Sequence, residues 1–247
     1  MKQFLLFLTL VSILSANDTE SLLKAKELFK NKSYDQALEI LEKSSETTPL
    51  NVDELKLQAK IHYAKGNVED ALDSLYLALK QKSKDPEIYL ELVKLYSTSK
   101  RYKGALEVCE NGIKKFPNSL ELNLQLASLL PRFGKVPASL QLIEKLKAEF
   151  PSDPRPLSIE SNLYLYRADF DKAEISIKWA ISLDEKNQDY KNNLAIVYEK
   201  KGDFLLKQKK EKEAKESFEL AWKEIQSLNS NNPIIASNQE RIKRKAS

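Results

Sequence analysis

A small side chain returns every thirty-four residues along this chain of 247 residues. Three residues before each one stands a larger side chain, and four residues after each one stands an apolar one. A second column of mostly small residues runs twelve positions upstream of the first. A fixed period of this length predicts an array of one supersecondary unit. The first column is Ala37, Ala71, Ala105, Ser139 and Ala173, and the second is Ala25, Ala59, Val93, Ala127, Ser161 and Ala195.

Each period splits into two helical patterns joined by a short polar turn. In the second unit we expect helices over residues 52–65 and 68–81, with Gly66 in the turn between them. Ala71 and Leu75, with the apolar residues that continue their spacing, form one face of the second helix. Glycine suits the turn because it adopts a positive φ without a Cβ clash.

Glycine and proline follow the same period. Gly134 and Gly202 return at the turn position at intervals of sixty-eight residues. Prolines stand where second helices are expected to end, because a proline cannot continue the preceding helix. These prolines are Pro49, Pro117 and Pro151.

The sixth unit departs from the period. Phe204 keeps the register, but Lys207 takes the position of the small residue, and the core series resumes seven residues late at Ala214. Seven residues are about two helical turns, so an insertion of this length keeps the same face inward. We therefore expect longer helices over residues 188–208 and 211–227, joined by an exposed tip.

Two stretches resemble the turn and second helix of the tetratricopeptide repeat. They are AKGNVEDALDSL, from Ala64 to Leu75, and NKSYDQALEIL, from Asn31 to Leu41. The resemblance extends over about residues 18–228, or six units. It implies an all-α fold: a right-handed superhelical solenoid of about six helix-turn-helix repeats, whose first helices line a concave groove.

The resemblance does not extend to the carboxylate clamp with which some family members bind the C-terminus of a partner. That clamp uses a fixed set of Lys, Asn and Arg side chains. The matching inner positions of the first three units do not reproduce this set, so a clamp for chaperone tails is not expected. They are Leu22, Lys26, Leu57, Glu87 and Glu91.

The N-terminus has the pattern of a secretory signal peptide. Lys2 precedes an apolar run that is too short to span a membrane, and Ala16 is a small residue suited to cleavage. A small residue is preferred two places before the cleavage site, and Leu14 departs from this preference. An uncleaved anchor or a first buried helix remain alternatives. We predict a signal peptide at 1–16, a solenoid at 17–228, and a capping helix with a basic tail at 229–247. The mature chain is expected in the periplasm or outside the cell, without a membrane-spanning segment.

The formal net charge of +4 is confined to the two ends of the chain. Lys2 and the tail account for it, and a neutral body offers no electrostatic surface for nucleic acid. A basic tail of this kind is typically a solvated end, although it could contact an acidic surface or lipid headgroups. Its cationic residues are Arg241, Lys243, Arg244 and Lys245.

No arrangement of residues in the sequence indicates catalysis. His62 is the only histidine and Cys109 the only cysteine, so neither a histidine-based metal site nor an intramolecular disulfide can form. Both fall in the core columns and are expected to pack inside their repeats. There is no Gly-rich phosphate loop, and the acidic residues are spread over helix faces. We expect no enzymatic activity, cofactor or metal.

The function that this sequence favours is binding of a protein or peptide in the groove. We expect a non-catalytic exported scaffold or adaptor that serves bacterial cell-envelope assembly or secretion. The alternative is a structural or oligomerising subunit of an envelope complex that docks through the extended sixth repeat. Asn and Gln can hold a peptide backbone and Lys can bind acidic side chains, although these positions could equally be ordinary solvated surface. The groove candidates are Lys56, Lys60, Tyr63, Lys94, Gln125, Asn162, Tyr166, Asn192 and Asn193.

Overall fold

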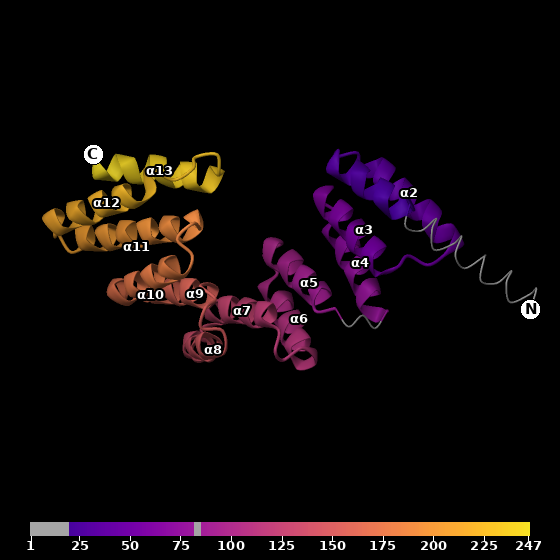
Figure 1. The fold of residues 1–247 in the computed structure, drawn as a ribbon, viewed down its shortest axis with the longest axis horizontal. Coiled ribbons are helices and arrows are strands. Elements are labelled where there is room, and N and C mark those ends of the chain that lie inside the picture. Colours follow the sequence, from indigo (N-terminus) through magenta and orange to yellow (C-terminus); the bar gives the residue numbers. More distant parts are fainter. Residues whose placement is uncertain (1–19, 82–84) are drawn as a thin grey trace, which may run out of the picture. The chain divides into compact units, whose positions relative to one another are not determined.

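The computed structural model describes residues 20–81 and 85–247, and within these ranges all regular secondary structure is helical (Figure 1). The chain divides into two compact units, Met1–Leu122 and Asn123–Ser247. The boundary falls inside helix α7 (Leu120–Leu129). The predicted signal peptide at residues 1–16 lies outside the described residues.

The first unit consists of helix pairs in which a first helix turns back into a second helix. Asn51 begins one first helix with a capping box: its side chain accepts hydrogen bonds from the backbone N–H groups of Asp53 and Glu54, and Glu54 accepts from the Asn51 N–H. The helices expected over residues 52–65 and 68–81 are confirmed to within one residue. The unit contains a helix over residues 20–30, α2 (Tyr34–Thr47), α3 (Val52–Ala64), α4 (Val68–Lys80), α5 (Glu87–Thr98) and α6 (Tyr102–Lys115).

The second unit continues the same pairing and ends in one more helix. Figure 1 shows α11 and α12 side by side, with α13 packed against them. The longer helices expected in the sixth repeat are confirmed, since α11 and α12 begin where predicted and end within two residues of the prediction. After α7 come a short 3-10 helix (Leu130–Phe133), α8 (Val136–Glu149), α9 (Arg155–Tyr166), α10 (Phe170–Leu183), α11 (Gln188–Lys207), α12 (Glu211–Ile225) and α13 (Pro233–Ala246).

The two columns of small residues form the contacts within helix pairs, as predicted. Every member of both columns is at most 4% exposed. Two serines show the geometry directly: Ser139 Oγ donates to the backbone oxygen of Ala127, and Ser161 Oγ donates to that of Ala173. A small side chain lets two helix backbones approach this closely, and a hydroxyl there finds its partner on the opposite backbone.

The turns inside the helix pairs place one residue in the left-handed region at the same point of each repeat. The prediction for Gly66 and Gly134 is confirmed, with φ values of 86° and 71°. Gly202 stands at the same point of the period, but the longer helix expected over residues 188–208 includes it, and this expectation is confirmed. Gly202 lies inside α11, and the positive φ of this repeat occurs seven residues later at Lys209. The insertion lengthens the first helix and moves the turn with it.

Helix α13 is held on α11 by charge as well as by apolar packing. The side chain of Glu199 is completely buried and accepts hydrogen bonds from Arg241, at 2.8 and 2.7 Å, and from Lys245, at 2.8 Å. Burial alone would raise the pKa of the Glu199 carboxyl, but these hydrogen bonds and positive charges lower it to about 2. Ile235 and Ile242 are buried in the core of the unit.

The expectation of a solvated basic tail is therefore wrong for two of its four cations. Arg241 and Lys245 neutralise Glu199, and Lys245 also binds both carboxylate oxygens of Asp203, at 2.7 and 2.8 Å. Lys243 and Arg244 remain exposed. Helical periodicity explains the division, because positions four residues apart share the face that meets α11.

Candidate functional site

A cleft lies between two successive first helices of the first unit, α3 and α5. Its volume is about 130 Å³. Three of the nine predicted groove residues meet there: Lys60 and Tyr63 from α3, and Lys94 from α5. Lys60 and Tyr63 share a face of α3 because they lie three positions apart, and Lys94 lines the same cleft from α5. The remaining lining residues are Ala59, Leu75, Glu91, Leu95 and Thr98.

The polar groups of this cleft are only partly satisfied. Lys60 Nζ lies 2.8 Å from Glu91 Oε1. The other carboxylate oxygen, Glu91 Oε2, is buried and has no hydrogen-bond partner among the described residues. Lys94 is exposed and forms no ion pair with any described residue. A buried acceptor without a partner costs about 1–3 kcal/mol, so a ligand that donates a hydrogen bond to Glu91 would relieve this cost.

Lys56, another predicted groove residue, is occupied within the fold. It is buried and binds Glu87, with Asp85 3.5 Å from its ammonium group. Burial works to lower the pKa of Lys56, but the hydrogen bond to Glu87 and the surrounding carboxylates raise it above its usual value. Lys56 therefore ties α3 to α5.

A second, larger cleft of about 460 Å³ lies in the second unit between α9 and α11. Two predicted groove residues, Asn162 and Tyr166, line it. Its apolar wall includes Phe170 and Phe204, whose ring centroids are 5.3 Å apart. The other lining residues are Leu165, Lys200, Asp203 and Lys207.

The remaining predicted residues lie outside both clefts. Gln125 is exposed on α7. Asn192 is buried and accepts a hydrogen bond from Asn238 of α13 at 2.9 Å, so the end helix covers it. Asn193 donates to Ser158 Oγ at 3.5 Å. A binding role for any of the nine positions stays a prediction.

Sequence reasoning missed several residues that line the clefts. In the sequence, Glu91 stands out only as a mismatch to the carboxylate clamp, although its Oε2 is the unsatisfied acceptor of the first cleft. In the sequence, Phe204 and Lys207 stand out only as markers of the irregular sixth repeat. The seven-residue insertion was the available signal, because lengthening a first helix necessarily adds side chains to the face beside the preceding repeat.

His62 and Cys109 are packed inside their repeats, as expected. The side chain of His62 is 17% exposed. Cys109 is completely buried, its Sγ donates to the backbone oxygen of Leu122 at 3.3 Å, and burial raises the pKa of its thiol to about 12. A thiol with this pKa forms almost no nucleophilic thiolate at neutral pH.

Residues 20–81 and 85–247 contain neither a cluster suited to a metal ion nor a helix suited to a membrane. No group of three or more His, Cys, Asp or Glu side chains in these ranges is placed to hold a metal ion. Within the same ranges, no helix combines the length and the apolar character needed to cross a bilayer.

Known sequences resemble this chain over part of its length. Residues 22–86 match the family model of the tetratricopeptide repeat. The signal recognition particle subunit SRP72 of Homo sapiens and that of Canis lupus familiaris are each 25% identical to it over 145 residues, or 56% of this chain. The match spans only 22% of the length of these curated relatives.

Solved structures resemble it over most of its length. A tetratricopeptide repeat protein from Parabacteroides merdae superimposes with a TM-score of 0.65 at 18% identity, covering 92% of this chain and 99% of the other. YrrB, described as a tetratricopeptide repeat protein with an unusual peptide-binding site, gives a TM-score of 0.52 at 17% identity, covering 68% of this chain and 86% of the other. With its regular helix pairs and the family match over residues 22–86, this chain has the all-α fold of tetratricopeptide repeat proteins.

Proposed function

We propose that this protein is a non-catalytic scaffold that binds a segment of a partner protein against its first helices. Tetratricopeptide repeat proteins are generally protein-interaction scaffolds, and this supports the class of function. The observation that carries the proposal is the cleft between α3 and α5. There Lys60, Tyr63 and Lys94 converge around Glu91, whose Oε2 is buried and has no partner within residues 20–81 and 85–247.

The chemistry of this cleft suits an extended peptide. A turn of the Glu91 side chain toward the cleft would let Oε2 accept a hydrogen bond from a backbone N–H of the peptide, which removes the cost of the unsatisfied acceptor. The ring of Tyr63, whose side chain is 44% exposed, offers an apolar contact and a hydroxyl. Lys94 is free to bind a peptide carbonyl or carboxylate.

Photocrosslinking tests this proposal. A photoreactive amino acid placed at Tyr63 should capture a partner protein, and the same group at Glu107, exposed on the second helix α6, should not. Replacing Glu91 with Leu, which removes the acceptor and keeps a side chain of similar volume, should reduce capture from position 63. Equal capture from both positions, or capture unchanged by Glu91→Leu, would contradict a site in this cleft.

We propose further that the protein is exported, to the periplasm or beyond, and serves envelope assembly or secretion in a bacterium. The support is the pattern of residues 1–16, a charged start followed by a short apolar run and a small residue at the expected cleavage point. Expression of the full chain in a bacterial host, followed by fractionation and mass spectrometry, tests this. Export with cleavage predicts a mature chain that begins at Asn17, whereas a cytosolic chain retaining residues 1–16 would contradict it.

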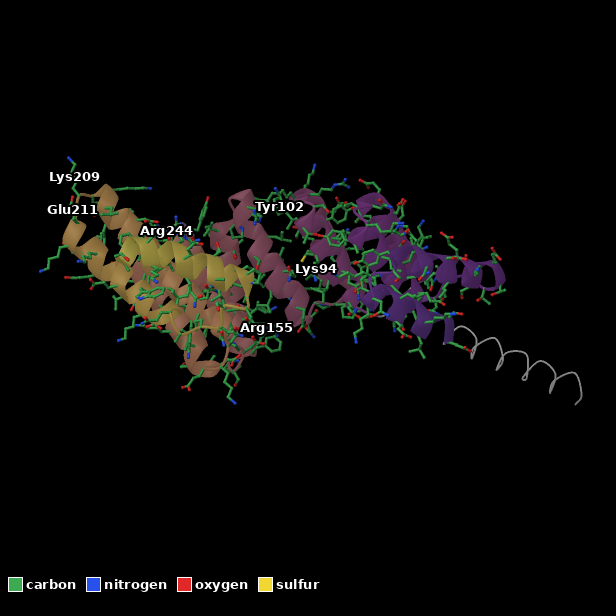
Figure 2. All side chains as sticks on the ribbon, turned by 90° about the horizontal axis from the view of Figure 1, so that it is seen from above. Lys94, Tyr102, Arg155, Lys209, Glu211 and Arg244 are labelled. Atoms are coloured by element: carbon green, nitrogen blue, oxygen red, sulfur yellow. The ribbon has the colours of Figure 1, made fainter. Side chains whose placement is uncertain are left out.

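The alternative role is that of a structural subunit that docks through the extended sixth repeat. The tip between α11 and α12 supports it, since residues 207–213 are all exposed and Figure 2 shows Lys209 and Glu211 projecting from the end of this helix pair. A photoreactive amino acid at Lys209 separates the two roles. Capture from position 209 without capture from position 63 would favour docking through the tip over binding in the cleft.

A further inference from the structure

We propose that the cleft between α9 and α11 binds an acidic segment of a partner protein that carries one large apolar anchor side chain. This inference rests on the proposed scaffold function and names the chemistry of one ligand. Three features of the second unit support it: the exposed aromatic wall of the cleft, its origin in the irregular sixth repeat, and a surplus of unpaired positive charge.

The wall of the cleft exposes more apolar surface than the fold requires. Tyr166 is 75% exposed and Phe204 is 40% exposed, and Phe170 packs against Phe204. The cleft volume of about 460 Å³ lies within the range of roughly 300–1,000 Å³ that is typical of ligand pockets. An apolar hollow with exposed aromatic rings is suited to one large anchor side chain, because such side chains dominate binding energy at interfaces.

The greater length of the sixth repeat adds side chains to this cleft. By the thirty-four-residue period, Phe204 occupies the position at which Tyr34, Tyr102 and Phe170 each begin a second helix. In α11 the same position is still inside the first helix. Phe204 and Lys207 therefore extend the face of α11 beside α9, where a regular repeat would already have turned back.

Once the internal ion pairs are taken into account, positive charge exceeds negative charge around the cleft. Asp203 is neutralised by Lys245 of α13. Asp171, near the start of α10, is 3.0 Å from Lys201, and Asp169 is 3.3 Å from Lys172.

Lys200 and Lys207, both exposed at the cleft, have no ion pair among the described residues. The tip that follows them carries three more lysines, Lys209, Lys210 and Lys212, against Glu211 and Glu213. This positive surplus favours an acidic occupant, because opposite charge speeds association and like charge at the rim opposes it.

Fluorescence anisotropy with synthetic peptides and the full chain tests the proposal. The probe is a short labelled peptide with one central Phe flanked by Asp and Glu. One control peptide has Ser in place of the Phe, and the other has Lys and Arg in place of the acidic residues. The acidic Phe peptide should bind at least about tenfold more tightly than either control, and added salt should weaken it.

Charge reversal in the protein locates the site. The double variant Lys200→Glu with Lys207→Glu should weaken the acidic Phe peptide at least about tenfold. The matched control is Lys80→Glu with Lys103→Glu, which makes the same change of charge at two exposed lysines of the first unit and should leave binding unchanged. Circular dichroism of both variants checks that their helix content is retained.

Three outcomes would overturn the proposal: no binding of the acidic Phe peptide, equal binding of the control peptides, or equal weakening by both double variants. A dimer that the Lys200 and Lys207 reversals convert to monomer would also overturn it, because the occupant would then be a second copy. The scaffold function is tested separately at Tyr63 in the other unit. Crosslinking retained there without acidic peptide binding would remove only this inference.

Discussion

At the scale of single residues, the most regular feature is the left-handed backbone at the turn of each helix pair. The position returns every thirty-four residues and then shifts by seven in the sixth repeat. Glycine occupies it in only two repeats, and the others place a side chain there. The residues are Lys32, Gly66, Lys100, Gly134, Ala168 and Lys209, with φ between 57° and 86°.

The strain of a Cβ at this position predicts that adding a side chain lowers stability, whereas removing one does not. Gly66→Ala should lower the free energy of unfolding by about 1 kcal/mol, because a side chain is strained at positive φ. A Cβ at Gly66 would meet no atom within 4 Å, so the effect would come from the backbone alone. Urea unfolding followed by circular dichroism measures the change.

The reverse substitution, Ala168→Gly, is the control. It relieves the same strain, and the extra freedom that glycine has in the unfolded chain offsets part of the gain. We therefore expect a stability equal to or slightly above that of the parent. A loss of stability in Ala168→Gly, or none in Gly66→Ala, would show that the turn position does not determine the effect.

At the scale of helices, the sixth repeat shows how a long helix pair accommodates a large side chain. Gly202 lies within α11 opposite Phe218 of α12. A Cβ built at Gly202 would stand 2.5–2.9 Å from three atoms of that ring. The absence of a side chain at Gly202 therefore leaves the space that the Phe218 ring occupies.

Gly202→Ala should destabilise the second unit by about 1–3 kcal/mol, because overpacking outweighs the better helix propensity of alanine. Trp179 and Trp222 are the only tryptophans and both lie in this unit, so their fluorescence during urea unfolding reports on it. Adding Phe218→Leu, which makes room for the new methyl group, should recover part of the loss. If the double variant were no more stable than Gly202→Ala, steric conflict with the ring would not be the cause.

The contact between α13 and α11 predicts a dependence of stability on pH. The pKa of the Glu199 carboxyl is about 2 in the folded protein, below the ordinary value of about 4.3 in an unfolded chain. A carboxyl with a lowered pKa contributes stability above its unfolded pKa and loses it as the pH falls toward its folded value. The unfolding midpoint of the second unit should therefore fall between about pH 4.5 and pH 2 by an amount that depends on Glu199.

Glu199→Gln should reduce this pH dependence and cost on the order of 2–3 kcal/mol at pH 7, because Arg241 and Lys245 lose a buried partner. The cost stays below that of a fully buried pair, since both cations are partly exposed. Glu240→Gln, a change at an exposed carboxylate of α13, should have little effect. Equal pH profiles for the two variants would rule out Glu199 as the cause.

At the scale of the whole molecule, the chain comprises two compact units, and the stability of each unit is considered separately. In the second unit, a continuous core runs from Leu157 through Ile177 and Leu194 to Ile235 and Ile242 of α13. The basic end of the chain is part of this core and its ion pairs. Removing the basic end of the chain therefore changes the stability of the second unit.

Deletion of residues 229–247 should destabilise the second unit by about 3–5 kcal/mol, because Ile235 and Ile242 no longer cover apolar surface of α11 and α12. Trp222 lies under this helix, with Lys243 Nζ 5.9 Å from its ring centroid, so its fluorescence should change in the folded state. Hydrogen exchange should show faster exchange in α11 and α12 and unchanged protection in α3 and α4. Equal loss of protection in both units would contradict this localisation.

Most of the fold could be predicted from the sequence, and the candidate site only in part. The helix bounds of the second repeat and the lengthened α11 followed from spacing, as did the burial of Cys109. The predicted helix over residues 188–208 includes Gly202, but the contact between Gly202 and the ring of Phe218 could not be predicted. Spacing along one chain does not reveal which distant ring will occupy a given space.

The sequence alone determined the repeating helix pairs, because the period, the small side chains and the turns act over short separations within one pair. Tertiary structure decided which polar side chains are engaged within the fold and which stay available to a ligand. Lys56 and Lys60 lie one helical turn apart, yet Lys56 is buried against Glu87, whereas Lys60 stays at the cleft. Asn162 is exposed, whereas Asn192 is covered by α13. These partners lie thirty-one and forty-six residues away, and pairing over such separations depends on how neighbouring helices pack.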